Sequence, residues 1–291
     1  MPRVNMREML ATAARERYGV GAFNILDFNT MWATVEAAEE CRAPVIIQTS
    51  VKTVKLYGHD AVISWYNTLA EQASVPVAIH LDHCKDIDFI RRCIDAGWTS
   101  VMIDASSYPL EQNIEMTQQV VEMAQPHDVS VEGELGEIGG VEDDMEVDMA
   151  EARYADPEKA KQFLENVRVD VFAPNIGTAH GVYKGEPKVA FDLVDRIYRE
   201  NGVPLALHGG TGLSEDTFKR CIAGGCAKVN ISTNLKRTYI ESFDDYRKQK
   251  PEDYEPIRVI GHQIGAAKEM IKEKILLFGG GGKADSSRAA S

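Results

Sequence analysis

One carboxylate and two imidazoles follow a single apolar stretch of this chain. Residues 75–79 are typical of a buried strand, and His80, Leu81, Asp82 and His83 come directly after them. Neighbouring side chains on an extended strand point to opposite faces. We therefore interpret Asp82 as a proton-transfer group and His83 as a metal ligand at the point where the strand gives way to a loop. His80 either orients a ligand from behind or packs in the core.

Two more histidines occupy corresponding places in the chain. His180 follows the apolar residues 169–173, and His208 follows residues 205–207. A lone polar residue after a strand usually caps a helix or lines a turn. That explanation is weak here, because only seven histidines exist and three of them follow separate strand-like stretches. Three neutral imidazoles suit Zn²⁺ or a similar divalent ion with an open coordination position.

Other polar side chains also fall just after apolar stretches. For Asp104 or Asn24 alone, capping or turn formation explains the residue at least as well as a functional role. With the histidines included, the residues in this position are Asn24, Gln48, Ser50, Asp82, His83, Asp104, Glu134, His180, His208 and Asn230. We expect them to converge if their strands end at one mouth.

Two glycine-bearing segments contain two of the histidines. Residues 177–184 surround His180, and residues 208–212 begin with His208. Glycines let the backbone approach a ligand closely, and exposed N–H groups form a nest for an anion. The hydroxyls of residues 230–233, together with Lys184, could complete a phosphate site.

The loop at residues 136–145 is acidic and contains a pair of glycines. Such a loop can close over a site and carry a catalytic residue with it. A solvated acidic loop with no catalytic role explains the composition equally well.

Apolar stretches and helical patterns alternate along the chain. The strand-like stretches are 20–23, 44–47, 77–79, 100–103, 129–131, 169–172, 205–207 and 227–229, and the helical patterns are 29–40, 59–73, 87–96, 110–124, 157–166, 189–199, 214–223 and 235–248. Eight such units predict an α/β fold of the (β/α)8 TIM-barrel type. An open doubly wound sheet is the competing architecture. We prefer the barrel because it directs the downstream end of every strand to a single mouth.

We expect one domain over residues 1–278, with an additional C-terminal helix near 265–278. The glycine- and serine-rich tail, residues 279–291, is expected to be disordered. No apolar run reaches the length of a membrane span, and the N-terminus lacks the apolar segment of a signal peptide, so we expect a cytoplasmic protein without a membrane partner. Five cysteines without a CxxC pair are typical of reduced thiols. The net charge of −13 without a basic stripe argues against nucleic acid as a partner.

The sequence resembles the class II, metal-dependent ketose-bisphosphate aldolases of the fructose- and tagatose-bisphosphate type. The resemblance runs from residue 21 to about residue 278 and depends on seven motifs. They are HLDH (80–83), VMID (101–104), VEGELG (131–136), GGVED (139–143), GTAHGVYK (177–184), HGGTG (208–212) and KVNIST (228–233). The resemblance implies a (β/α)8 barrel and one Zn²⁺ per subunit, bound by His83, His180 and His208 with Glu134 nearby. It further implies a monovalent cation, Na⁺ or K⁺, near the phosphate loops and a homodimer or homotetramer. Co²⁺ or Mn²⁺ could replace Zn²⁺.

The activity implied by the resemblance is reversible aldol cleavage of a phosphorylated sugar to dihydroxyacetone phosphate and an aldehyde. Asp82 would remove the proton of the C4 hydroxyl, Glu142 would protonate the carbon of the dihydroxyacetone half, and Asn230 would hydrogen-bond the reacting carbonyl region. The residues implied for the C1 phosphate are Gly181, Lys184, Gly209, Thr211 and Thr233. Those implied for the sugar end are Asn24, Gln48 and Ser50.

Three departures from the family pattern concern the far end of the sugar. Fructose-bisphosphate relatives usually carry aspartates where this chain has Ser232 and Asn234. Lys236 stands where an arginine commonly reaches the distal phosphate of a neighbouring subunit, and Cys84 stands where glycine is usual. We therefore expect Ser232, Asn234 and Lys236 to affect the choice of ketose. A metallohydrolase on the same barrel and a non-catalytic sugar-phosphate binder are the alternatives.

Overall fold

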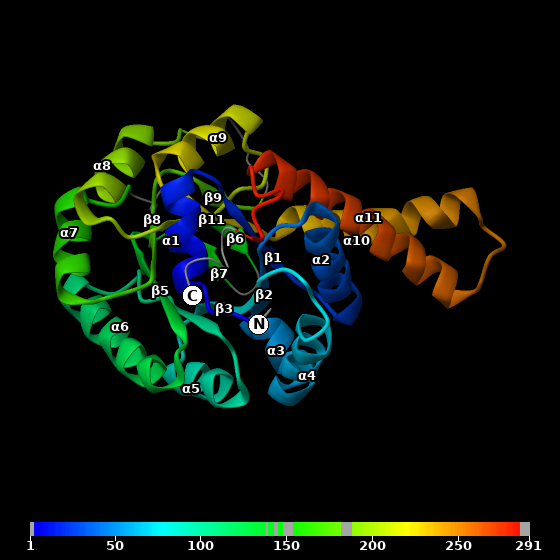
Figure 1. Cartoon of the computed structure of the whole chain (residues 1–291), viewed down its shortest axis with the longest axis horizontal. Coiled ribbons are helices and arrows are strands. Elements are labelled where there is room, and N and C mark those ends of the chain that lie inside the picture. The colour runs from blue at the N-terminus through cyan, green and yellow to red at the C-terminus, as the bar shows by residue number, and fades with distance from the viewer. Residues whose placement is uncertain (1–2, 138, 143–144, 148–153, 182–187, 286–291) are drawn as a thin grey trace.

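The computed structural model describes residues 3–137, 139–142, 145–147, 154–181 and 188–285. The barrel strands are β1 (Val20–Asn24), β2 (Val45–Ser50), β3 (Val77–Cys84), β4 (Ser100–Ile103), β5 (Ser130–Leu135), β8 (Val171–Pro174), β10 (Leu205–Leu207) and β11 (Cys226–Ile231). They form a closed parallel barrel in the order β1-β11-β10-β8-β5-β4-β3-β2 (Figure 1). This confirms the predicted (β/α)8 barrel, and each predicted strand has its counterpart.

Most of the helices lie around the outside of the barrel, and α1 lies across one end of it (Figure 1). They are α1 (Arg7–Glu16), α2 (Phe28–Cys41), α3 (Val51–Tyr57), α4 (His59–Ala70), α5 (Ile87–Ala96), α6 (Leu110–Ala124), α7 (Pro157–Asn166), α8 (Phe191–Asn201), α9 (Glu215–Gly224), α10 (Thr233–Gln249) and α11 (Pro256–Leu277), with a short 3₁₀ turn at Gln125–His127. The helices α1 and α3 were not predicted from the sequence.

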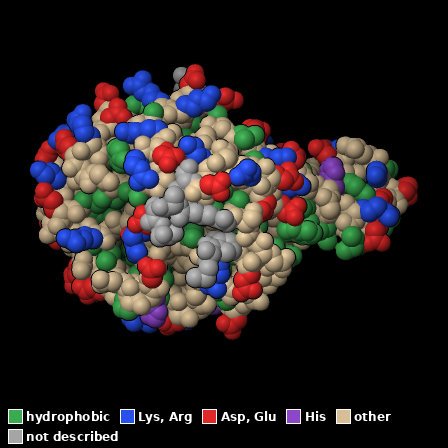
Figure 2. Space-filling view, viewed as in Figure 1, with side chains coloured by type: hydrophobic (Ala, Val, Ile, Leu, Met, Phe, Trp, Pro, Cys, Tyr) green, Lys and Arg blue, Asp and Glu red, His purple; other side chains and the backbone are tan. Residues whose placement is uncertain are grey.

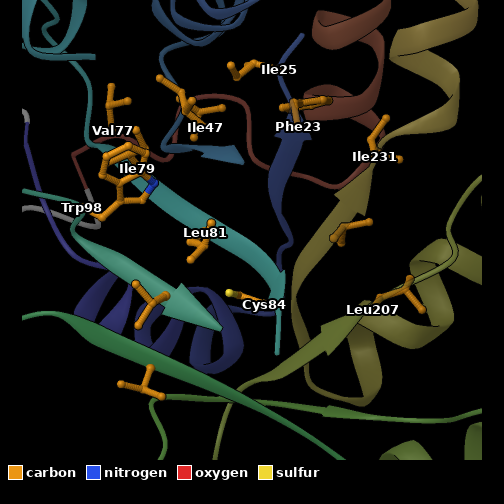
Figure 3. Packing of buried hydrophobic residues seen from close by; sticks show 14 of the residues in the cluster. Phe23, Ile25, Ile47, Val77, Ile79, Leu81, Cys84, Trp98, Leu207 and Ile231 are labelled. Atoms are coloured by element: carbon orange, nitrogen blue, oxygen red, sulfur yellow. The ribbon is translucent and has the colours of Figure 1, made fainter. Parts of the chain in front are cut away.

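Two buried clusters hold the strands in place. The larger cluster lies between the strands and the outer helices and includes Phe23, Ile47, Leu81 and Trp98 (Figure 3). The smaller one packs residues of the barrel strands, many of them alanines, against Met9 and other apolar residues of α1. The strands are therefore buried on both faces, which explains why they appear in the sequence as nearly continuous apolar runs.

Strand register aligns the polar side chains that follow these runs. On adjacent strands Asn24 pairs with Gln48, and Ser50 pairs with Asp82. All four of these side chains are buried. Because the strands are parallel and in register, polar residues separated by 24 or more positions in sequence reach the same end of the barrel.

A small second sheet follows two of the barrel strands. Its strands are β6 (Gly139–Glu142), β7 (Met145–Val147) and β9 (Ala179–His180), in the order β7-β6-β9. The backbone of Gly140 pairs with that of His180. The segments after β5 and β8, which the sequence pattern presented as loops, therefore lie side by side.

The last two helices extend beyond the barrel as a long arm (Figure 1). The helix α11 begins at Pro256, nine residues before the predicted start, and the Glu255 side chain accepts a hydrogen bond from Ile257 N. Gly261 and Gly265 interrupt the apolar pattern of this helix. Both lie where an added Cβ would meet no atom within 4 Å, so they sit on its exposed face without ending it.

The prediction of a disordered tail is wrong for residues 279–285. The N–H groups of Gly282 and Ala284 donate to the carbonyl oxygens of Cys41 and Arg42 at 2.9 and 3.0 Å. Lys283 also lies 3.0 Å from the carboxylate of Glu16. These contacts fix the segment against the C-terminal ends of α1 and α2. No helix in the described ranges is both long enough and apolar enough to cross a membrane.

Candidate metal and aldol site

Three side chains with metal-binding atoms meet where β3, β5 and β10 end. The ligand atoms of His83, Glu134 and His208 all lie within 4.8 Å of one another. The rings of His83 and His208 stand edge to face with centroids 4.7 Å apart. Imidazole and carboxylate are the ligands found in catalytic zinc sites, so this cluster fits a divalent cation.

His83 reaches this cluster through a break in the regular geometry of β3. The strand continues to Cys84, but its register with β4 shifts between Leu81 and Cys84, and His83 has a left-handed backbone with φ of 42°. A regular strand would send Asp82 and His83 to opposite faces. The bulge lets both side chains reach the mouth. The change of direction therefore lies inside the strand, whereas the sequence pattern predicted it at the end of the strand.

Carboxylates surround the His83 ring. Its Nδ1 lies 3.1 Å from Asp104 Oδ2 and 3.8 Å from Glu134 Oε2. Burial opposes a charged imidazole, but the charges of Asp82, Asp104 and Glu134 raise the pKa of His83 well above its ordinary value. The same negative charges favour a metal cation at this position.

Glu134 is buried, and its Oε2 has no hydrogen-bond partner among the described residues. Burial and the nearby charge of Asp104 raise the pKa of Glu134 well above its ordinary value. A buried carboxylate oxygen without a partner requires an explanation, and a bound cation provides one. This observation supports a metal site independently of the histidines.

His208 contacts Glu132, a buried residue that was not among the site residues predicted from the sequence. Its Nε2 lies 2.8 Å from Glu132 Oε1, and its Nδ1 lies 3.6 Å from Glu134 Oε2. Glu132 also contacts Lys228 Nζ at 2.9 Å and His80 Nε2 at 3.5 Å. Burial opposes its ionisation, but Lys228 and the His208 hydrogen bond hold the pKa of Glu132 below its ordinary value.

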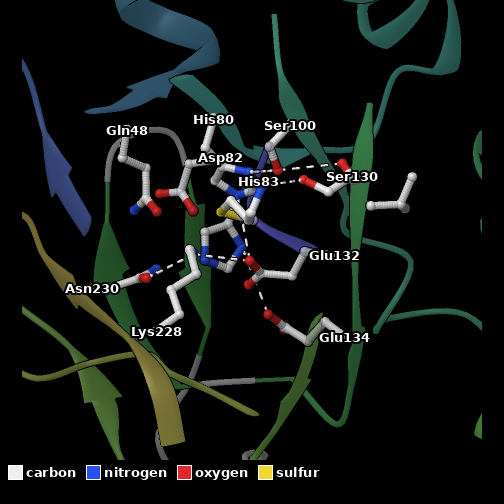
Figure 4. Close-up of polar contacts among 12 residues, drawn as sticks. Gln48, His80, Asp82, His83, Ser100, Ser130, Glu132, Glu134, Lys228 and Asn230 are labelled. Atoms are coloured by element: carbon white, nitrogen blue, oxygen red, sulfur yellow. Dashed lines mark hydrogen bonds and ion pairs between the residues drawn. The ribbon is translucent and has the colours of Figure 1, made fainter. Parts of the chain in front are cut away.

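His80 supports the cluster and does not join the metal-binding group. Its Nδ1 lies 2.8 Å from Ser100 Oγ (Figure 4). Burial and the charge of Lys228 lower the pKa of His80 to about 3, so its ring is neutral.

A residue spacing of two could have revealed Glu132 and Lys228. Glu132 and Glu134 share one face of β5, and Lys228 and Asn230 share one face of β11. Side chains alternate along a strand. Once Glu134 and Asn230 are assigned to the mouth, Glu132 must therefore lie on the same face of β5 as Glu134, and Lys228 on the same face of β11 as Asn230.

A chain of hydrogen bonds orients Asp82. Gln48 Nε2 donates to Asn24 Oδ1 at 2.7 Å, and Asn24 Nδ2 donates to Asp82 Oδ2 at 2.9 Å. The second carboxylate oxygen of Asp82, Oδ1, has no hydrogen-bond partner among the described residues. One oxygen is therefore held and the other is available to a substrate hydroxyl.

A cavity of about 410 Å³ opens beside Asn24. Two lysines, Lys52 and Lys236, contribute to its wall. The other lining residues are Asn24, Ile25, Leu26, Ser50, Thr53 and Leu56. The structure thus brings together the predicted residues Asn24, Ser50 and Lys236 and adds Lys52, which sequence reasoning missed.

The predicted phosphate loops also meet. Gly209 has a φ of 65°, and a Cβ there would lie 2.5 Å from the carbonyl oxygen of Ala179. This residue must be glycine for the two loops to approach so closely. Thr211 and Ser232 are buried, and Ser232 Oγ has no hydrogen-bond partner among the described residues. Thr233 begins α10, and Gly181 has a φ of 84°.

Three predicted residues are not located by their side chains. Lys184 and the side chains of Glu142 and His180 lie outside the described residues. The backbones of Glu142 and His180 belong to β6 and β9, which pair with each other.

A (β/α)8 barrel with histidines and carboxylates gathered at the carboxyl ends of its strands defines a metal-dependent barrel enzyme. A family profile described as fructose-bisphosphate aldolase class-II matches residues 4–283, and the chain belongs to this family. It is therefore a carbon–carbon lyase that cleaves ketose phosphates by a reversible aldol reaction.

Relatives and solved structures agree with this assignment. A fructose-bisphosphate aldolase of Geobacillus stearothermophilus is 40% identical, with 98% of this chain and 99% of the relative covered. A sulfofructosephosphate aldolase of Alkalicoccus urumqiensis is 37% identical with the same coverage. The crystal structure of the YdjI aldolase from Escherichia coli K12 superposes with a TM-score of 0.86 at 32% identity, covering 97% of this chain and 99% of that one.

Proposed function

We propose that this aldolase uses one Zn²⁺ per subunit, bound by His83, His180 and His208 with Glu134 beside them. The observation that carries the proposal is the convergence of His83, Glu134 and His208 within 4.8 Å next to Asp82. When bound, the ion supplies a Lewis acid that polarises the substrate carbonyl. Co²⁺ or Mn²⁺ has compatible ligand preferences, and zinc is the first choice because two imidazoles already face the cluster.

Asp82 is proposed to transfer the proton of the C4 hydroxyl. Cleavage of the C3–C4 bond turns that hydroxyl into the carbonyl of the aldehyde product, so a base must take its proton. The unpartnered Oδ1 supports this role, because Asn24 holds the other oxygen and fixes the direction of the carboxylate.

Glu142 and Asn230 complete the proposed catalytic group. Glu142 would protonate the carbon of the dihydroxyacetone half, and its backbone belongs to a strand that pairs with the His180 strand. Asn230 is buried, and its Nδ2 has no hydrogen-bond partner among the described residues. That amide N–H is suited to an oxygen of the reacting carbonyl region.

The C1 phosphate is proposed to lie between the loops after β8, β10 and β11. Gly209 and Thr211 support this because the loops approach each other closely at Gly209, and Thr211 places a buried hydroxyl on the same loop. The full proposed set is Gly181, Lys184, Gly209, Thr211 and Thr233. A monovalent cation, Na⁺ or K⁺, is proposed beside the same loops.

The far end of the sugar is proposed to enter the cavity lined by Lys52 and Lys236. Two lysines in the wall of this cavity favour an anionic terminal group. Fructose and tagatose 1,6-bisphosphate carry a phosphate there. Sulfofructose phosphate, named for one relative, carries a sulfonate in its place. The proposed substrate is therefore a ketose phosphate with a second acidic group at its far end.

Exchange of the C3 proton of dihydroxyacetone phosphate with solvent is the sharpest test. This reaction needs only the half of the substrate that the metal, Glu142 and the phosphate loops would handle. We expect exchange that disappears after chelation and returns with Zn²⁺. Exchange that persists in metal-free protein would overturn the proposed role of the metal, and binding without any exchange would indicate a non-catalytic protein.

We also propose a homodimer or homotetramer that resides in the cytoplasm. Several large apolar side chains on α10, α11 and their connection are exposed, including Ile240, Tyr254 and Ile257. Figure 2 shows the arm standing clear of the barrel, with apolar side chains along it. Exposed apolar groups on a projecting element are typical of an association surface.

A further inference from the structure

Lys228 is a fully buried lysine inside the barrel. None of its surface is exposed, and its Nζ lies 2.9 Å from Glu132 Oε2 and 2.8 Å from Asn230 Oδ1 (Figure 4). Removing a charged amine from water is costly unless it is paired and hydrogen-bonded. One contact of Lys228 is with Asn230, a proposed catalytic residue. The other is with Glu132, which in turn contacts the proposed metal ligand His208.

We propose that Lys228 is a positioning residue of the aldolase site, which orients Asn230 directly and His208 through Glu132. This inference rests on the proposed metal site, because an effect of Lys228 on catalysis through His208 requires that His208 binds the metal. Neither Lys228 nor Glu132 belongs to the metal-binding cluster itself.

The contact with Lys228 decides which way the Asn230 amide faces. An ammonium group has three donors and no acceptor, so only the carbonyl oxygen of Asn230 can face it. The Nδ2 group must then point away, and it is buried without a hydrogen-bond partner among the described residues. Lys228 thus presents Asn230 to the substrate as a donor and prevents the amide from rotating.

The contact with Glu132 decides which nitrogen of His208 faces the site. One carboxylate oxygen of Glu132 contacts Lys228, and the other contacts His208 Nε2. An ionised carboxylate only accepts, so Nε2 must donate and Nδ1 must carry the lone pair. Nδ1 is the nitrogen that faces Glu134. This is the arrangement in which a carboxylate fixes the tautomer of a metal-binding histidine.

His80 holds the same carboxylate from another side. Its Nε2 lies 3.5 Å from Glu132 Oε2, and Ser100 fixes its ring through Nδ1. His80 is neutral and cannot replace the charge of Lys228. Loss of the lysine would therefore leave Glu132 as a buried carboxylate without its cation and free the Asn230 amide to rotate.

Two variants separate these effects. Lys228→Met removes the cation at similar length, and the double variant Lys228→Met/Glu132→Gln also removes the carboxylate charge. The glutamine can still accept from His208 Nε2 through its amide oxygen. Lys219→Met is the matched control, because Lys219 is an exposed lysine on α9 that pairs with Glu215 across one helical turn.

Zinc affinity, measured by competition with a chromophoric chelator, is the first readout. Lys228→Met should weaken zinc binding about 10- to 100-fold, the usual effect of losing a partner behind a ligand. The double variant should recover most of the affinity and the thermal stability. It should still show a kcat about 100-fold low with little change in KM, because the Asn230 donor is no longer held.

The tautomer of His208 gives a readout that needs no metal. Long-range ¹H–¹⁵N spectra of metal-free protein should show His208 protonated at Nε2, and Lys228→Met should alter that signal. His208→Gln assigns the signal by its loss. Wild-type zinc affinity and an unchanged tautomer in Lys228→Met, or full kcat in the double variant, would overturn the inference. A wild-type protein that shows the tautomer but binds no zinc would instead overturn the proposed metal site.

Discussion

Asp82 and His83 show how two adjacent residues can serve one site. His83 has a left-handed backbone conformation within β3, and the bulge there lets both side chains reach the mouth of the barrel. A non-glycine residue in this conformation is costly by about 1–3 kcal/mol when the surroundings impose it. The sequence identified both residues, but the bulge depends on pairing with β4 and cannot be read from residues 80–83 alone.

The Asp82→Asn variant tests the proposed proton transfer. The asparagine oxygen can still accept from Asn24, so the fold and zinc content should be preserved. Turnover should fall at least about 100-fold, the usual size of a general acid–base contribution. Steady-state kinetics with zinc analysis checks this, and His83→Gln serves as the control that loses metal. Near-normal turnover of Asp82→Asn would refute the role.

Lys52→Met tests the proposed anionic far end of the substrate. KM should rise about tenfold for a ketose bisphosphate, as expected for one lost charge-assisted hydrogen bond. A ketose 1-phosphate without the second acidic group should be unaffected. Lys55→Met is the matched control, because Lys55 is an exposed residue of the same helix outside the cavity wall. Equal changes for both substrates would contradict the assignment.

At the level of elements, α11 is fixed to α2 by charge as well as by packing. Lys268 and Lys272 both approach Glu40 at 2.7 Å. Their hydrogen bonds lower the pKa of Glu40 to about 2. A carboxylate whose pKa is depressed by folding stabilises the folded state above its unfolded pKa. That stabilisation is lost as the pH falls toward the folded value.

Glu40→Gln should therefore lower the melting temperature at pH 7, by a modest amount because the group is exposed. The difference from wild type should shrink as the pH falls from about 4 toward 2. Calorimetry over that range checks the trend. Glu215→Gln removes an exposed pair on α9 and is the control. A difference that grows toward low pH would contradict the assignment.

Eight strand–helix units were predictable because each strand is apolar over most of its length. The helices α1 and α3 and the sheet of β6, β7 and β9 were not. The helix α1 gains its position by closing one end of the barrel interior, a tertiary contact that no local pattern shows. Lys52 was missed because a lysine in the sequence is expected on the surface. Lys228 was missed for the same reason, although its spacing of two from Asn230 places both on one face of β11.

At the scale of the whole molecule, the arm of α10 and α11 sets this protein apart from a plain barrel. A double variant, Tyr254→Asp/Ile257→Asp, should shift the proposed oligomer toward smaller species, because charges replace exposed apolar groups on the arm. Light scattering after size exclusion measures this. Leu276→Asp is the control, an exposed apolar residue near the other end of α11. An unchanged mass would exclude this part of the arm as the contact.

The pairing of β1 with β11 has a consequence for synthesis of the chain. Val20 pairs with Lys228, so the barrel cannot close until the last strand, β11, has been synthesised and can pair with the first strand, β1. At ribosomal rates this interval is roughly 10–40 s. During that time β1 has an open edge, and Glu132 has no buried cation beside it. Pulse proteolysis of nascent chains ending before and after residue 231 should show protection only in the longer chains. One strand thus supplies both the closing seam of the barrel and the lysine that faces Glu132, so ring closure and the pairing of this buried carboxylate depend on the same segment.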